Sequence, residues 1–128
     1  MPYVDTLSTW DLDFGKQVWQ ALRENKLFPV HGALWLLESD KGWRLLLATP
    51  RVDEVGPRKA YEQLGNITRG FVPGATQQLM IELISPGLPL YQALRRIFGQ
   101  TASVEGARLG NTQVDGMYID GAYLYEVR

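Results

Sequence analysis

Residues 32–50 constrain the fold of this chain more than any other stretch. They contain two apolar runs of strand length, 32–38 and 43–50, separated by a short turn that carries Asp40 and Gly42. Two such runs joined by a short turn predict an antiparallel hairpin. Neither run alternates cleanly between apolar and polar residues, as expected for strands that are covered on both faces. The hairpin is therefore predicted to lie at the centre of the core.

Three other stretches show the periodicity of amphipathic helices. Their apolar residues recur at intervals of three and four, which places them on one face of a helix. Gly65 interrupts the second stretch, and Gly99 is expected to end the third in a left-handed conformation. We expect helices over residues 9–27, from Asp53 or Pro57 to about residue 69, and from Leu90 to Phe98.

Three extended segments complete the predicted sheet. A strand over 78–84 follows the second helix, so it forms a right-handed parallel unit with the hairpin if both belong to one sheet. A short strand is expected around 104–109 and a longer one over 117–127, which is interpreted as an edge strand. At a period of two, one side of this last strand is predicted to hold Met117, Ile119, Tyr123, Tyr125 and Val127.

The whole chain, residues 1–128, is predicted to form a single α+β domain. One mixed sheet of four or five strands is built around the central hairpin, and about three helices pack on it. A chain of 128 residues suits one domain and buries about two thirds of the surface that it exposes when unfolded. The composition, 45% hydrophobic and 21% charged, excludes disordered and fibrous classes.

The absence of cysteine restricts the chemistry further. It excludes disulfides, thiolate nucleophiles and thiolate metal sites. His31 is the only histidine, and a lone histidine before a core strand is more often a structural or surface residue than a general base. Acidic residues such as Glu38 and Asp40 do not match a carboxylate metal site, and no glycine-rich nucleotide motif occurs. No catalytic residue, metal or cofactor is assigned, and whether the protein is an enzyme stays open.

Charge and hydropathy indicate which partners and which cellular location to expect for the protein. The 13 Lys and Arg residues against 14 Asp and Glu residues argue against nucleic acid as the main partner. The first residues lack the pattern of a secretory signal, and every apolar run is far shorter than the about 20 residues that span a bilayer. A cytoplasmic protein without a membrane partner is the expectation.

The connector after the hairpin holds the strongest candidate for a binding site. Arg51, Arg58 and Lys59 flank a predicted helix N-terminus, whose free N–H groups favour an anion. Arg44 is expected nearby on the preceding strand. The alternative is that these residues are solvated or paired with neighbouring carboxylates, which is ordinary for surface arginines.

Tyrosines on the last strand suggest a contact surface. Tyr118, Tyr123 and Tyr125 are the interface candidates, because aromatic residues on an edge strand favour pairing with another chain. The first functional hypothesis is a non-enzymatic interaction or accessory protein that acts through its surface in a homodimer or larger complex. The second is a phosphate- or nucleic-acid-binding domain, with or without enzymatic activity, that uses Arg51 and the first turn of the following helix.

Overall fold

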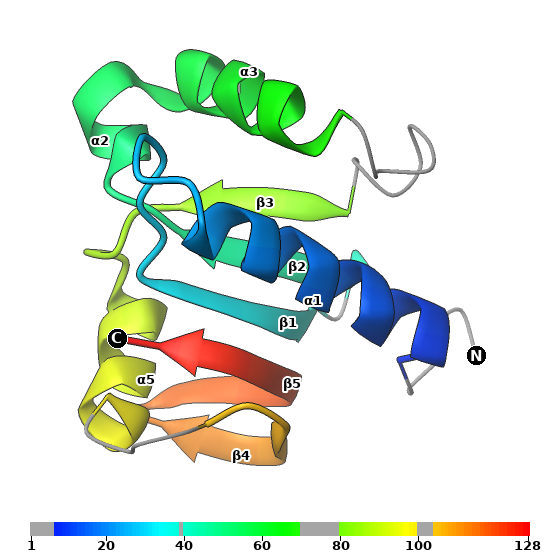
Figure 1. Ribbon diagram of the computed structural model, residues 1–128. Coiled ribbons are helices and arrows are strands. Elements are labelled where there is room, and N and C mark those ends of the chain that lie inside the picture. Colours follow the sequence, from blue (N-terminus) through cyan, green and yellow to red (C-terminus); the bar gives the residue numbers. More distant parts are fainter. Residues whose placement is uncertain (1–6, 39, 70–79, 100–103) are drawn as a thin grey trace.

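A computed structural model describes residues 7–38, 40–69, 80–99 and 104–128. They form one five-stranded mixed sheet with helices packed on both of its faces (Figure 1). The predicted α+β class and the single mixed sheet are confirmed, and the described residues contain four helices where about three were expected. None of the helices in these ranges is long and apolar enough to cross a membrane.

The hairpin lies at the centre of the sheet, as predicted. Strand β1 pairs antiparallel with β2 on one side and with β5 on the other. Strand β2 pairs in parallel with β3, and β4 pairs antiparallel with β5. The strand order is therefore β3-β2-β1-β5-β4. The strands are β1 (Gly32–Glu38), β2 (Gly42–Ala48), β3 (Ile81–Ile84), β4 (Ala107–Val114) and β5 (Met117–Val127).

Two predictions about the strands after residue 100 are wrong. The last strand, β5, is not an edge, because it lies between β1 and β4, and the two outer strands are β3 and β4. The short strand expected around 104–109 is displaced along the chain to Ala107–Val114. It is displaced because it pairs with β5 across the tight turn at Asp115 and Gly116, which both have positive φ.

Local sequence signals explain where the helices begin and end. In α1, Ser8 and Asp11 form a reciprocal capping box, and the helix ends at Arg23, before the predicted end at residue 27. The second predicted helix is two helices, because Gly56 between them has a φ of 87°, which interrupts the helical backbone. Gly99 has a φ of −65°, so the left-handed terminator is wrong. The helices are α1 (Thr9–Arg23), α2 (Arg51–Val55), α3 (Pro57–Thr68) and α5 (Pro89–Phe98).

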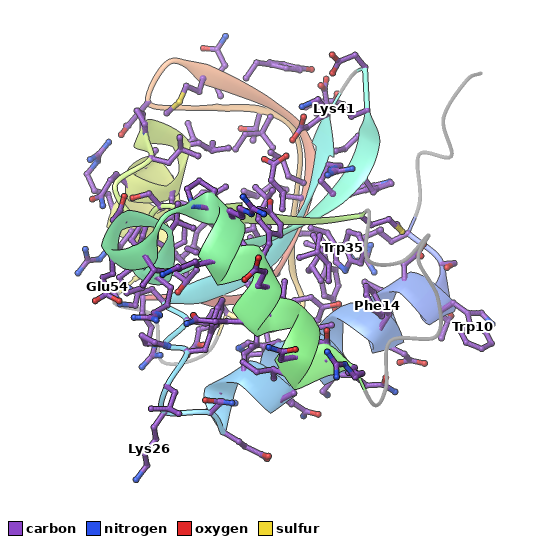
Figure 2. All side chains as sticks on the ribbon, turned by 90° about the horizontal axis from the view of Figure 1, so that it is seen from above. Trp10, Phe14, Lys26, Trp35, Lys41 and Glu54 are labelled. Carbon is purple, nitrogen blue, oxygen red and sulfur yellow. The ribbon has the colours of Figure 1, made fainter. Side chains whose placement is uncertain are left out.

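The sheet separates two hydrophobic clusters. Helices α1 and α3 cover one face, where Phe14 and Trp35 lie close together between α1 and the sheet (Figure 2). Helix α5 covers the other face through Tyr91 and Leu94. Trp35 and Leu94 are fully buried, so each face contributes a core of its own.

Strand β5 does not alternate regularly between the two faces. Tyr123 and Tyr125 pack in the cluster under α1, whereas Ile119 and Val127 pack in the cluster under α5, so the predicted common side is wrong. A register shift between β1 and β5, where Ala33 pairs with Glu126 and Leu34 with Leu124, accounts for the change of side between Tyr125 and Val127. As a result Glu126, next to Tyr125, also faces α1 and accepts a hydrogen bond from Trp19 on that helix.

Candidate functional site

The cationic residues that the sequence proposed as an anion site do not converge. Arg44 lies on β2 towards the hairpin turn, with a terminal guanidinium nitrogen 4.0 Å from Glu82 Oε1. Arg51 begins α2, beyond the other end of the same strand (Figure 1). Its guanidinium donates to Gln63 Oε1 and to Glu54 Oε1, both at 3.1 Å. These two arginines are therefore separated along the sheet, and each has a neighbouring acceptor.

The first turn of α3 carries the other two candidates. Arg58 is 94% exposed at its side chain and lies 3.8 Å from Glu62 Oε1, four residues further along the helix. Lys59 is also exposed. This arrangement matches the alternative reading of a solvated or locally paired surface. Exposed pairs of this kind contribute little to stability.

The three tyrosine candidates have different surroundings. Tyr118 is 57% exposed, and its hydroxyl donates to Asn111 Oδ1 on β4 at 3.0 Å. Tyr123 is half-buried, and the guanidinium of Arg108 lies 4.8 Å from its ring centre. Tyr118 therefore reaches solvent beside the outer strand, while Tyr123 is partly covered by a cation–π contact.

Tyr125 lies inside the molecule. It is 3% exposed, and its hydroxyl accepts a hydrogen bond from Trp35 Nε1 at 3.0 Å and donates one to the Leu12 carbonyl at 2.7 Å. Burial raises the pKa of this tyrosine strongly, because the charged phenolate loses its hydration. Tyr125 thus leaves the set of surface candidates and connects α1 to the sheet.

A pocket lies at the end of the sheet where β1 begins and β5 ends. Its volume is about 410 Å³, and four segments line it: the end of α1, the connection to β1, the last turns of α5 and the residue after β5. No aspartate or glutamate is among the described residues that line it. The polar part of the lining consists of Arg23, Asn25, Lys26, His31, Arg95 and Arg128.

Pairing of β1 with β5 positions the centre of this pocket. Gly32 pairs with Val127, and the next backbone N–H, that of Arg128, donates to the His31 carbonyl at 3.0 Å. The Arg128 guanidinium donates to the Val30 carbonyl at 2.9 Å. The backbone oxygen of Arg128 accepts a hydrogen bond from the Tyr91 hydroxyl on α5 at 3.1 Å. Arg128 is therefore held by contacts to the β1 connection and to α5.

Trp19 and Glu126 contact two of the arginines that line the pocket. Trp19 Nε1 donates to Glu126 Oε1 at 2.9 Å, and the other oxygen of this carboxylate lies 3.1 Å from Arg128 Nε. The guanidinium carbon of Arg23 lies 4.9 Å from the centre of the Trp19 ring. Both contacts orient an arginine side chain at the pocket without covering all of its N–H groups.

Lys26 and Arg95 complete the positive lining. Neither has a carboxylate within 4.0 Å among the described residues. Lys26 projects away from the body of the protein and belongs to the rim (Figure 2). Helix dipoles favour cations in the last turns of α1 and α5, which accounts for Arg23 and Arg95 but not for Lys26 and Arg128.

The pocket is more positive than the chain as a whole. Four of the 13 Lys and Arg residues line it, although the net charge of the chain is −1. Sequence reasoning missed this site because its cations are distributed over the full length of the chain. His31 was the one lining residue considered as a functional group, and its backbone N–H donates to the Ala48 carbonyl at 2.8 Å, which fixes its position at the start of β1.

Comparison with known proteins adds no functional assignment to this geometry. No protein-family model, no curated protein sequence and no solved structure matches the chain.

Proposed function

We propose that this protein binds an anionic ligand in the pocket between α1, α5 and the paired ends of β1 and β5. The observation that carries the proposal is the lining: four cationic side chains, no aspartate or glutamate among the described lining residues, and three cations without an acidic side chain within 4.0 Å in the described ranges. Cations of one sign around a concave site raise the local concentration of anions. The anion-binding hypothesis from the sequence is kept, but its site moves away from the N-terminus of α3.

Arg95→Gln is the variant that tests this proposal. Arg95 is exposed on α5, so the change removes one positive charge from the pocket and keeps much of the side-chain stem. We expect the affinity for pyrophosphate at low ionic strength, measured by isothermal titration calorimetry, to fall about five- to tenfold, the effect of one charged contact that is partly screened by solvent.

Arg58→Gln is the matched control, because it removes the same charge from the exposed surface of α3. It is expected to change the affinity less than about twofold. Equal losses in both variants would mean that pyrophosphate binds through overall charge and would contradict the proposal. A loss in Arg58→Gln alone would return the site to the first turn of α3.

A second candidate function is self-association, and the exposed ring of Tyr118 supports it. The ring is 57% exposed on β5 beside β4, which pairs with one strand only among the described strands and is an outer strand of the sheet. Outer strands can pair with the same strand of a second copy, and exposed aromatic residues often dominate such contacts.

Tyr118→Glu is expected to weaken dimerisation at least about tenfold in sedimentation velocity, because a buried charge replaces an aromatic contact. Trp10→Glu is the control, since Trp10 is 80% exposed on α1 and projects away from the body of the protein (Figure 2). A wild-type protein that stays monomeric at high micromolar concentration would contradict this second candidate.

A further inference from the structure

We infer that the ligand of this pocket is a small organic molecule with a dianionic phosphate group, an inference that rests on the anion-binding function proposed above. The charge of the pocket is the first argument. Four cationic side chains line it, and among the described residues only Arg128 has an acidic side chain within 4.0 Å, that of Glu126, so three positive side chains have no acidic partner there. A single carboxylate or sulfate ester would compensate one of them, whereas a phosphate monoester compensates two at neutral to alkaline pH.

The free donors of the two arginines are the second argument. Arg128 directs Nε to Glu126 and one terminal nitrogen to the Val30 carbonyl, so the N–H groups of its other terminal nitrogen have no partner among the described residues. Arg23 lies over the Trp19 ring, which leaves the in-plane N–H groups of its guanidinium available. Two arginines that are fixed by other contacts and still have free N–H donors suit the several acceptor oxygens of a phosphate group.

The size and lining of the pocket indicate more than a free phosphate ion. A volume of about 410 Å³ lies in the range that holds small organic ligands. Leu22, Pro29 and Val30 supply the apolar part of the lining, next to the charged groups. An organic group attached to the phosphate would contact these residues, while the phosphate itself meets the arginines.

The charge distribution elsewhere favours a small molecule over nucleic acid. A nucleic-acid backbone is followed by a continuous basic surface. Lys16, Arg51 and Arg58, outside the pocket, each lie within 4.0 Å of a carboxylate oxygen. Positive charge is therefore balanced locally at these places, whereas Arg23, Lys26 and Arg95 at the pocket have no carboxylate within 4.0 Å among the described residues.

Phenyl phosphate and phenyl sulfate form a matched pair of probes. They have nearly the same shape, but at about pH 8 the phosphate ester is a dianion, since its second pKa is about 6, and the sulfate ester is a monoanion. We expect phenyl phosphate to bind at least about tenfold more tightly in isothermal titration calorimetry at matched ionic strength. It should also shift the indole N–H resonance of Trp19, assigned with Trp19→Phe, because Trp19 contacts both Arg23 and Glu126.

The outcomes separate this inference from the function on which it rests. Equal binding of both probes, weakened by Arg95→Gln in each case, would overturn the inference that the ligand is a dianion and leave the anion-binding function intact. Binding of a 5′-phosphorylated oligonucleotide without binding of phenyl phosphate would overturn the small-molecule ligand. If neither probe nor pyrophosphate binds, the proposed function itself fails.

Discussion

Replacing Gly15 with alanine is expected to destabilise the protein by about 2–3 kcal/mol, although alanine favours helices more than glycine does. Gly15 is buried in α1, where the helix approaches the sheet. A Cβ at this position would lie 2.5 Å from the Tyr125 hydroxyl oxygen and 2.7 Å from Trp35 Nε1. Both atoms belong to a buried hydrogen bond, so they cannot move aside without breaking it. The free energy of unfolding from urea titration measures the effect.

Gly65→Ala is the matched control, because it is the same change inside another helix. Gly65 lies in α3, and a Cβ there would meet no atom within 4 Å. The substitution is expected to stabilise the protein by up to about 1 kcal/mol through helix propensity alone. If Gly15→Ala were as stable as Gly65→Ala, the close packing of α1 on Trp35 and Tyr125 would be refuted.

Replacing Tyr125 with phenylalanine is expected to lower the free energy of unfolding by about 1–3 kcal/mol at neutral pH. The change removes one hydroxyl and keeps the ring, which stacks on Trp19 with ring centres 5.6 Å apart. Trp35 Nε1 and the Leu12 carbonyl both lose their partner, and Trp35 is fully buried. Tyr118→Phe, which removes an exposed hydroxyl, is expected to cost less than about 0.5 kcal/mol.

The same variant should change the response of stability to alkaline pH. Burial raises the pKa of Tyr125 above 10.0, and burial also raises that of Tyr91, so the folded state keeps these protons longer than the unfolded chain does. The contribution of Tyr125 is therefore complete below about pH 10, the pKa of an unfolded tyrosine, and is lost as pH rises towards the higher folded-state pKa.

Urea unfolding of wild type and Tyr125→Phe across this alkaline range tests the linkage. In the variant, the fall in stability above about pH 10 should be shallower by up to about 1.4 kcal/mol per pH unit, the effect of one proton. Parallel curves for the two proteins would show that Tyr125 ionises equally in the folded and unfolded states.

The local sequence pattern was sufficient to predict the strands at the centre of this fold. The apolar runs 32–38 and 43–50 and the turn between them predicted the β1–β2 hairpin, and the helix that follows led to the parallel β3. These features depend on neighbouring residues, so their physical causes lie within short stretches of sequence. Arg58 and Glu62 are a further example, since residues four apart meet on a helix surface whatever the rest of the chain does.

The local sequence pattern could not predict the position of the last strand in the sheet. Strand β5 was interpreted as an edge, but it lies between β1 and β4. Which strand lies next to β1 depends on the energy of pairing residues about ninety positions apart, as in Leu34 and Leu124, and no local pattern encodes that choice. The burial of Tyr125 follows from this central position.

The charges of this protein, the hairpin and the apolar faces of its helices follow from the order of its amino acids. The folded arrangement, in contrast, brings Arg23, Lys26, Arg95 and Arg128 to one pocket. Their meeting depends on the pairing of Gly32 with Val127 and on the packing of α1 and α5 on opposite faces of the sheet. Attraction between an anion and a cation depends on distance in space, whereas the sequence records only distance along the chain.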